Sequence, residues 1–334
     1  MSMPDVFNGD AFNMVSLTTA INKLPYVPNR IGQMGLFTEQ GVSTNTVAME
    51  QINGVISLLP SKPRGTAGTT TTPEARTMRS LDIPHIPHDA TILASAIQGV
   101  REFGSENQLS AVNKVVNDTL TRMRRSHELT HEWLRMGAIK GIVLDGDGST
   151  TLYNLFTVFG VGQPSDVDFL LGTDTTDIAT ILLGVVETIE AALGAESYDH
   201  IHCFCNSTWF KKFVAHPQVK YAYQYFQEGR ALREDMRKGF EFMGVTFEVY
   251  RGTVNSTPFV ADDECQFFPV GVPDLFMQFN GPADFVETVN TIGLPVYAKQ
   301  KVMDFDRGIE IHTQSNPLCI CTRPGVLVQG ISSN

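Results

Sequence analysis

The chain has 334 residues, of which 42% are hydrophobic, enough for one large or two ordinary cores. Its formal net charge of −11 is uneven, because residues 1–140 hold 13 basic and 12 acidic side chains whereas residues 141–334 hold 12 and 24. The acidic half argues against tight DNA contact there. Since the sequence shows no signal-peptide pattern and no apolar run of roughly 20 residues, we expect a soluble protein that is not secreted.

Residues 1–37 predict an N-terminal arm with one short amphipathic helix that is ordered by docking. Two strand-like stretches follow, Val42–Leu59 and Met78–Leu93, and a segment rich in Pro, Gly and Thr joins them. We therefore expect a long hairpin within residues 38–95. The apolar face of the arm helix consists of Met14, Leu17, Ile21 and Leu24.

The hairpin is basic at its tip and base, where Lys62, Arg64, Arg76 and Arg79 lie. A long unsupported loop in a compact domain is usually functional or disordered, so we expect this one to reach a partner surface. The acidic second half of the chain supplies such a surface on another molecule. The alternative is that these side chains only solvate the tip, since exposed ion pairs contribute little individually.

The stretch from Ser105 to about Ile139 predicts one long helix. Ser105 and Gln108 form a capping-box pattern, and Pro is absent throughout. At 1.5 Å per residue the helix is roughly 50 Å long, far beyond the typical helix of a globular protein. Apolar residues keep helical spacing at Leu109, Val112, Val116, Leu120 and Met123.

The same helix contains His127-Glu128-Leu129-Thr130-His131, which matches the H-E-x-x-H pattern of zinc peptidases. In those enzymes two His bind zinc and the Glu activates a water, but a third protein ligand is required. The next Glu after Glu132 is Glu187, and the alternative metzincin extension fails at Leu134 and Gly137. We therefore interpret the two His as packing or surface residues, and we expect no metal and no enzymatic activity.

After the helix, strands are expected at Ala138–Leu144 and Thr151–Phe159. The Asp145-Gly146-Asp147-Gly148 sequence between them favours a hairpin turn, because the later ligands of a calcium loop do not follow. His85, His88 and Asp89 lie in a Pro-flanked extended segment, where we expect a structural role at the start of a strand.

From Asp174 helices and strands alternate, which predicts a mixed α/β domain. A helix closed by Gly194 is followed by a strand at His200–Cys205, a helix capped by Asn206 or Ser207 and stopped at Pro217, and a half-buried strand at 245–250. The segment Pro295–Ile331 is rich in strands, which could pair with those after the long helix. The α/β domain would then be an insertion. The apolar face of the helix closed by Gly194 consists of Ile178, Ile181, Leu182, Val185 and Ile189.

Four of the five cysteines form two C-x-C pairs, Cys203/Cys205 and Cys319/Cys321, each on one face of an expected strand. Zinc or a disulfide between the pairs is conceivable. Because C-x-C lacks the usual zinc spacing, we favour buried free thiols in a reducing compartment.

Several segments in order resemble the lambda-type major capsid protein E family of tailed bacteriophages. They are CNSTWFKKFVAHPQVKYAY, GVTFEVYRG, FFPVG, VETVNTIGLPVYAKQ and IEIHTQSNPLCICTRPGVLV, between about His202 and Val328. The first 200 residues resemble the family in layout. The resemblance implies an α+β fold of the Hong Kong 97 capsid type. Its parts would be an N-terminal arm (1–37), an extended loop (38–95), a spine helix (96–139), a peripheral domain (140–165 and 286–334) and an axial domain (166–285).

The resemblance also implies a function, which is self-assembly into hexamers and pentamers of an icosahedral phage head that encloses double-stranded DNA. Partners would be other copies of the chain, a portal, a scaffold, possibly a decoration protein and, non-specifically, the packaged DNA, but no membrane. The chain would reside in the virion after assembly in the host cytoplasm, and no cofactor is implied. The competing hypotheses are a zinc metallopeptidase built on His127, Glu128 and His131, and a non-viral α/β protein.

Overall fold

The computed structural model describes residues 13–23, 30–52, 76–97, 108–194, 196–226, 239–254 and 257–333. They divide into two compact units, each built from three separate parts of the chain. Unit 1 consists of Met1–Asn45, Asp82–Asn154 and Asp274–Thr322, and unit 2 of Thr46–Leu81, Leu155–Pro273 and Arg323–Asn334. Unit 2 is therefore largely an insertion in unit 1.

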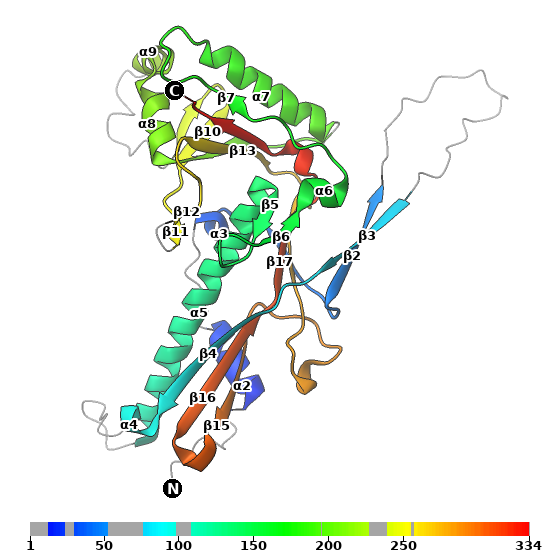
Figure 1. Ribbon diagram of the computed structural model, residues 1–334, viewed down its shortest axis with the longest axis vertical. Helices are drawn as coiled ribbons and strands as arrows, with labels where there is room; N and C mark the ends of the chain where they lie inside the picture. The colour runs from blue at the N-terminus through cyan, green and yellow to red at the C-terminus, as the bar shows by residue number, and fades with distance from the viewer. Residues whose placement is uncertain are drawn as a thin grey trace, which may run out of the picture. The chain divides into compact units, whose positions relative to one another are not determined.

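The dominant element of unit 1 is helix α5, which runs without interruption from Gln108 to Lys140 (Figure 1). It confirms the predicted long helix and is about 50 Å long at 1.5 Å per residue. Ser105 lies outside the described residues, so the expected capping box does as well. Ala138 to Lys140, expected in a strand, are the last turn of this helix.

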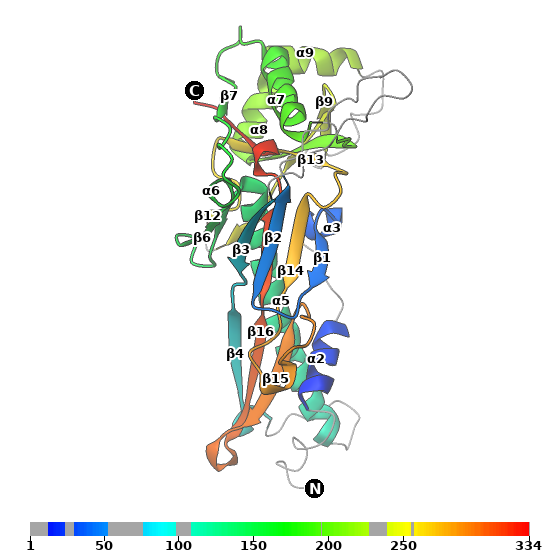
Figure 2. The ribbon, with the colours of Figure 1, turned by 90° about the vertical axis from the view of Figure 1, so that its right-hand side faces the viewer.

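A three-stranded antiparallel sheet, ordered β15-β16-β4, runs alongside α5. Its strands are β4 (Ile86–Leu93), β15 (Tyr297–Val302) and β16 (Gly308–Ser315). Helix α2 (Met14–Lys23) lies against β15 in the same unit (Figure 2). Buried aliphatic residues close the space between α2, α5 and the sheet, namely Leu17, Ile21, Ile92, Val116, Leu120, Met123, Val296, Ala298, Ile309 and Ile311.

The second sheet of unit 1 has the order β1-β14-β17, in which β1 (Thr38–Gly41) is parallel to β14 (Phe276–Asn280) and β17 (Pro317–Cys321) is antiparallel to it. Strand β17 also packs on α5. The remaining elements of unit 1 are α3 (Arg30–Met34), α4 (Ala94–Ile97), β5 (Ile142–Leu144), β6 (Thr151–Asn154), and the 3-10 helices η4 (Val286–Thr288) and η5 (Asp304–Asp306).

The predicted hairpin is only partly correct. Strand β2 (Thr46–Ile52) does pair with β3 (Arg76–Asp82), but the second expected stretch contains two strands rather than one. Its latter half, β4, leaves the hairpin and pairs with β16, more than 200 residues away in sequence. His88 and Asp89 lie inside β4 and His85 just before it. The connection between β2 and β3 lies outside the described residues.

The strands after α5 also differ from the expectation. Strands β5 and β6 form the predicted hairpin, and the Asp147 side chain organises its turn by accepting hydrogen bonds from the backbone of Ser149 and Thr150. The Thr150 hydroxyl donates to the same carboxylate, and these bonds hold the Asp147 pKa well below its usual value. Residues Leu155–Phe159 form helix α6 instead of extending a strand. Among the described strands, β5 and β6 pair only with each other, so the expected pairing with the C-terminal strands is wrong.

Unit 2 is organised around a six-stranded mixed sheet with the order β7-β18-β13-β8-β10-β9. The expected helix is α7 (Ile178–Leu193), capped by Asp177 and closed by Gly194, and the expected strand is β8 (His200–Cys205). Asn206 caps α8 (Ser207–Ala215), and Pro217 begins α9 (Pro217–Phe226). The other elements are β7 (Val167–Asp168), β9 (Phe240–Phe242), β10 (Val245–Val249), β11 (Thr253–Val254), β12 (Thr257–Pro258), β13 (Glu264–Val270), η6 (Pro324–Val326) and β18 (Val328–Ile331).

Two further expectations are corrected in unit 2. Strand β10 is almost entirely buried instead of half-buried, because it lies inside the sheet and even Glu248 is only 6% exposed. Strand β18 pairs with β13 and β7, so the last strand belongs to the sheet of unit 2. The five cysteines are free and buried, as predicted, and the two C-x-C pairs belong to different units.

The core between α2 and α5 yields a stability prediction. Replacing the fully buried Leu120 with Ala leaves a cavity against Leu17 and Ile21 and should lower the free energy of unfolding by about 2–5 kcal/mol. Leu129→Ala on the same helix is the control, since Leu129 is 40% exposed, and it should cost less than about 1 kcal/mol. Equal urea midpoints for the two variants would contradict this packing.

Candidate functional site

The middle of α5 presents a buried face that is polar. Its six residues recur at intervals of three, one, three, one and three positions, which places them on one side of a helix. Each is at most 9% exposed. A helix face in such a position is ordinarily apolar, so every polar group here needs a partner. We call this set the polar face; it consists of Arg124, His127, Glu128, His131, Glu132 and Arg135.

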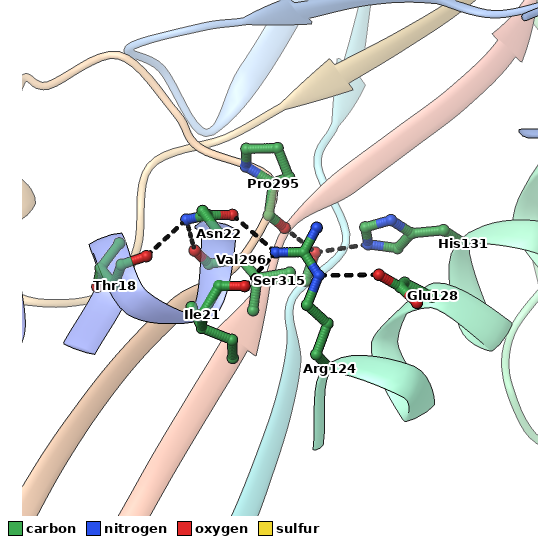
Figure 3. Close-up of polar contacts among 9 residues, drawn as sticks. All are labelled: Thr18, Ile21, Asn22, Arg124, Glu128, His131, Pro295, Val296 and Ser315. Atoms are coloured by element: carbon green, nitrogen blue, oxygen red, sulfur yellow. Dashed lines mark hydrogen bonds and ion pairs between the residues drawn. The ribbon is translucent and has the colours of Figure 1, made fainter. Parts of the chain in front are cut away.

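Arg124 joins α5 to α2 (Figure 3). Its Nε donates to Glu128 Oε1 at 2.8 Å, one turn along the helix, and both side chains are buried. Its Nη1 donates to the backbone oxygen of Ile21, near the end of α2, and to Asn22 Oδ1 at 3.3 Å. The guanidinium therefore donates a hydrogen bond to a carbonyl in the last turn of α2, which has no partner within that helix.

Helix α2 in turn covers the free edge of β15. The Thr18 hydroxyl accepts a hydrogen bond from Ala298 N at 3.1 Å and lies 3.2 Å from Ala298 O, to which it donates. Asn22 Nδ2 donates to Val296 O at 2.9 Å and to Thr18 O at 2.9 Å (Figure 3). Side chains of α2 thus replace a neighbouring strand, which an edge strand otherwise lacks.

The two His connect α5 to β16. His127 Nε2 lies 3.0 Å from Thr313 Oγ1, and His131 Nε2 lies 2.7 Å from Ser315 Oγ. Each hydroxyl donates its proton onward, Thr313 to His88 O and Ser315 to Pro295 O. Each hydroxyl must therefore accept from the imidazole, which assigns the Nε2–H tautomer to both His.

Burial keeps both imidazoles neutral. Loss of hydration lowers the pKa of His127 to about 4, with further contributions from His88, Arg124 and His312. The pKa of His131 falls to about 3 for the same first reason, reinforced by Arg135, His127 and Arg124. Near neutral pH both imidazoles are therefore uncharged and keep only the proton on Nε2. They act as hydrogen-bond donors rather than as acids.

Glu132 and Arg135 attach two more segments. Glu132 accepts from the amides of Ile31 at 2.7 Å and Gly32 at 3.3 Å, the otherwise unpaired donors at the start of α3. Arg135 donates through Nε to Gln278 on β14 at 2.8 Å and through Nη2 to Glu39 on β1 at 2.7 Å. The polar face therefore holds both helices of the arm (α2 and α3), the strand β1 that follows them, and the two later strands β14 and β16.

This geometry does not suit zinc peptidase chemistry. The Nε2 atoms of His127 and His131 are committed to hydroxyl groups, and Glu128 is paired with Arg124 and therefore cannot serve as a free base. In the described part of the chain, no group of three or more His, Cys, Asp or Glu is arranged to hold a metal ion. The interpretation of the two His as packing residues was right, but they are buried rather than on the surface.

The basic residues of the hairpin are separate from this site. Lys62, Arg64 and the side chain of Arg76 lie outside the described residues. Arg79 is half-buried in unit 2, with its Nε inaccessible and its Nη2 close to the backbone of Gly160. Its role at an interface stays a prediction.

Comparisons with known proteins agree with the resemblance seen in the sequence. The family model "Phage major capsid protein E" matches residues 13–332. The major capsid protein of Pseudomonas phage KPP10 is 29% identical, and that of Salmonella phage Felix O1 is 28% identical. These alignments cover 96% and 95%, respectively, of both the chain and the relative.

Solved capsid structures share the fold. A putative capsid protein of an E. coli CFT073 prophage superposes with a TM-score of 0.62 at 13% identity, over 96% of this chain and 99% of that one. The capsid of Myoviridae phage XM1 gives 0.52 at 10% identity, over 93% and 94%. The expected α+β fold of the Hong Kong 97 type is confirmed. No helix in the described residues combines the length and apolar character needed to cross a membrane.

Because both His are neutral in the folded protein, the folded state should lose stability as the pH falls. Because their folded pKa values of about 4 and 3 lie below the ordinary 6.5, the unfolded chain binds protons more readily. Their contribution is complete above pH 6.5 and declines as the pH falls towards 4, by roughly 2 kcal/mol per His at pH 5. The melting temperature of a His127→Gln/His131→Gln variant should therefore fall less between pH 7 and pH 5 than that of the wild type. Parallel pH profiles would contradict the assignment.

Removing the Arg124 guanidinium should destabilise the subunit much more than removing an exposed one. Arg124→Met leaves Glu128 buried without its partner and should cost about 3–5 kcal/mol in unfolding free energy. Arg125→Met, next to it but exposed, should change stability by less than about 0.5 kcal/mol. Urea unfolding of both variants makes the comparison, and a small loss for Arg124→Met would show that the buried pair is dispensable.

Proposed function

Because the chain belongs to the phage major capsid protein E family, we propose that its hexamers and pentamers form the icosahedral head that encloses double-stranded phage DNA. The observation that carries this proposal is the family match over residues 13–332, almost the whole chain. Two relatives named as major capsid proteins align with this chain over 96% and 95% of their own lengths.

The polar face fits a structural role. It satisfies buried backbone groups of distant segments and leaves the residues of the peptidase motif engaged in packing. We propose that the protein performs no covalent chemistry and uses no cofactor. Its work is heterologous association, in which one surface of a copy binds a different surface of the next until a ring closes. Each contact is weak, but many are made at once.

We assign the parts of the subunit as follows. Residues 1–37 are the arm, 38–95 the extended loop, 96–139 the spine helix, 140–165 and 286–334 the peripheral domain, and 166–285 the axial domain. The compact inserted part of unit 2, Leu155–Pro273, supports an axial domain in this region. One boundary changes: because β18 (Val328–Ile331) pairs with β13, we propose that this last strand belongs to the axial domain rather than to the peripheral one.

The partners follow from the same proposal. The chain would bind other copies of itself, a portal, a scaffold and possibly a decoration protein, and the inner face would contact packaged DNA without sequence preference. It would assemble in the host cytoplasm and remain in the virion. The excess of acidic residues in residues 141–334 supports a shell that does not bind its DNA tightly.

Expression of the chain followed by electron microscopy tests the function. We expect rings or closed shells in the lysate. A compact monomer that persists at high concentration would contradict a capsid role.

The hairpin hypothesis has its own test. We expect Arg64→Glu/Arg76→Glu/Arg79→Glu to lower the yield of shells, because these side chains would then repel acidic groups on an adjacent subunit. The double variant that retains Arg79 separates this effect from misfolding, since Arg79 is half-buried. A variant with the same charge change at exposed Lys114, Arg125 and Lys211 is the control. Normal shells in normal yield from the double and triple variants would refute the electrostatic part.

A further inference from the structure

Between β14 and β15, unit 1 exposes four large aliphatic side chains within nine residues. Their exposed fractions are 89% for Val286, 65% for Val289, 71% for Ile292 and 43% for Leu294. Single exposed aliphatic residues are ordinary, but four within nine residues of one segment point to an interaction surface. We call these four residues the aliphatic knob.

The segment that carries the knob is held firmly, so the exposure does not come from a loose loop. Thr288 is buried, and its hydroxyl lies 2.6 Å from Ala283 O and 2.9 Å from Phe285 O. Leu294 N donates to the Tyr297 hydroxyl at 2.8 Å. A segment whose backbone is already held in place loses less conformational freedom on binding, which favours association.

A close approach between backbone segments fixes the C-terminal end of the segment that carries the knob. Gly293 N donates to Val42 O at 2.9 Å, and Val42 N donates to Asn280 O at 2.9 Å. A Cβ atom at Gly293 would lie 1.9 Å from Asn280 O, so only glycine permits this approach. The knob is thereby fixed to the ends of β1 and β14.

The charges around the knob are already paired. Glu287 is the only ionisable residue from 286 to 296, and both of its oxygens accept from Lys299 Nζ, at 2.7 and 3.0 Å. The Lys299 ammonium also lies 5.1 Å from the centre of the Phe285 ring. Lys299, the cation that contacts the knob segment in the described structure, is thus already paired, and the four aliphatic side chains favour a complementary surface that is apolar.

A groove of about 610 Å³ lies next to the knob, on the sheet face turned away from α5. His312 is paired with Asp89 on its floor, and Lys301 stands opposite Glu310 across two strands. Phe285 borders it and contacts the His312 ring, with centroids 5.7 Å apart. The groove therefore borders the knob with charges of both signs and an aromatic ring, which suits the polar rim of a protein–protein interface.

We propose that the aliphatic knob is a contact between copies of this chain and inserts into an apolar surface of a second copy. This inference rests on the proposed function, since a shell subunit meets other copies over much of its surface. Within the described part of unit 1 these four side chains stay exposed, so a second copy can cover them without displacing any part of that unit. The neutral surroundings of the knob match an apolar seat on another subunit and disfavour the packaged DNA.

Thiol protection tests the contact directly. The five native cysteines are buried, so Val286→Cys or Ile292→Cys adds one reactive thiol. We expect maleimide to label it readily in dissociated native subunits and at least about tenfold more slowly in assembled shells, because a second copy covers it. Equal labelling rates in shells and free subunits would overturn the proposal. Wild-type shells, with buried thiols only, measure the background.

A charge on the knob gives the second test. We expect Val286→Asp/Ile292→Asp to fold with the wild-type melting temperature, since both side chains are exposed, but to lower the yield of shells at least about tenfold. The single variants Val286→Asp and Val15→Asp make the matched comparison: Val15 is 66% exposed on α2, so Val15→Asp should assemble normally, whereas Val286→Asp should lower the yield. Wild-type yield from the double variant would overturn the proposal. If the wild-type chain forms no shells, the proposed function fails instead, which keeps the two failures distinguishable.

Discussion

The architecture of unit 1 depends on one constraint: the buried face of α5 must satisfy its own polar groups and those of the segments packed on it. Arg124 and Glu132 serve this purpose from opposite directions, one donating to the open carbonyl of Ile21 and the other accepting from the amides of Ile31 and Gly32. Short helices leave such groups unpaired at their ends, and burying them unpaired is costly. The long helix therefore supplies hydrogen-bond partners for the C-terminal end of α2 and the N-terminal end of α3, which these short helices cannot supply themselves.

The same constraint explains how an arm of few core residues becomes ordered. Leu17 and Ile21 supply the apolar contact, but Thr18 and Asn22 specify the position of α2 by bonding to the edge of β15. Apolar burial alone is non-directional, whereas these hydrogen bonds fix the register. For a protein that assembles into a shell, a subunit with fixed surfaces presents the same contacts to every neighbour.

The sequence predicted the elements whose signals are local. The long helix, the arm helix around Leu17 and Ile21, the turn at Asp147 and the Asn206 cap depend on spacing or on residues a few positions apart. It did not predict that β4 pairs with β16 instead of continuing the hairpin, because nothing near Ile86 indicates that Gly308–Ser315 is its neighbour. Leu155, Phe156 and Phe159 suit a helix as well as a strand, and only their packing decides between the two.

The polar face shows the same limit. His127, Glu128 and His131 were recognised as a peptidase pattern. The true partners of the two His, Thr313 and Ser315, lie more than 180 residues away, and Glu128 pairs with Arg124 on the same helix. The signal that could have revealed the site is the recurrence of polar residues from Arg124 to Arg135 at helical spacing, where an apolar stripe is expected. That pattern extends beyond the five-residue motif and includes Glu132 and Arg135, which sequence reasoning did not select.

Amide hydrogen exchange at Ile31 and Gly32 tests whether α5 orders the arm, because these two amides bond to the polar face rather than within their own helix. We expect strong protection of both amides in the wild type and its loss in a Glu132→Ala variant, while the amides in the interior of α5 stay protected. Rapid exchange at both amides in the wild type, or protection unchanged by the substitution, would contradict the claim that α5 holds the arm.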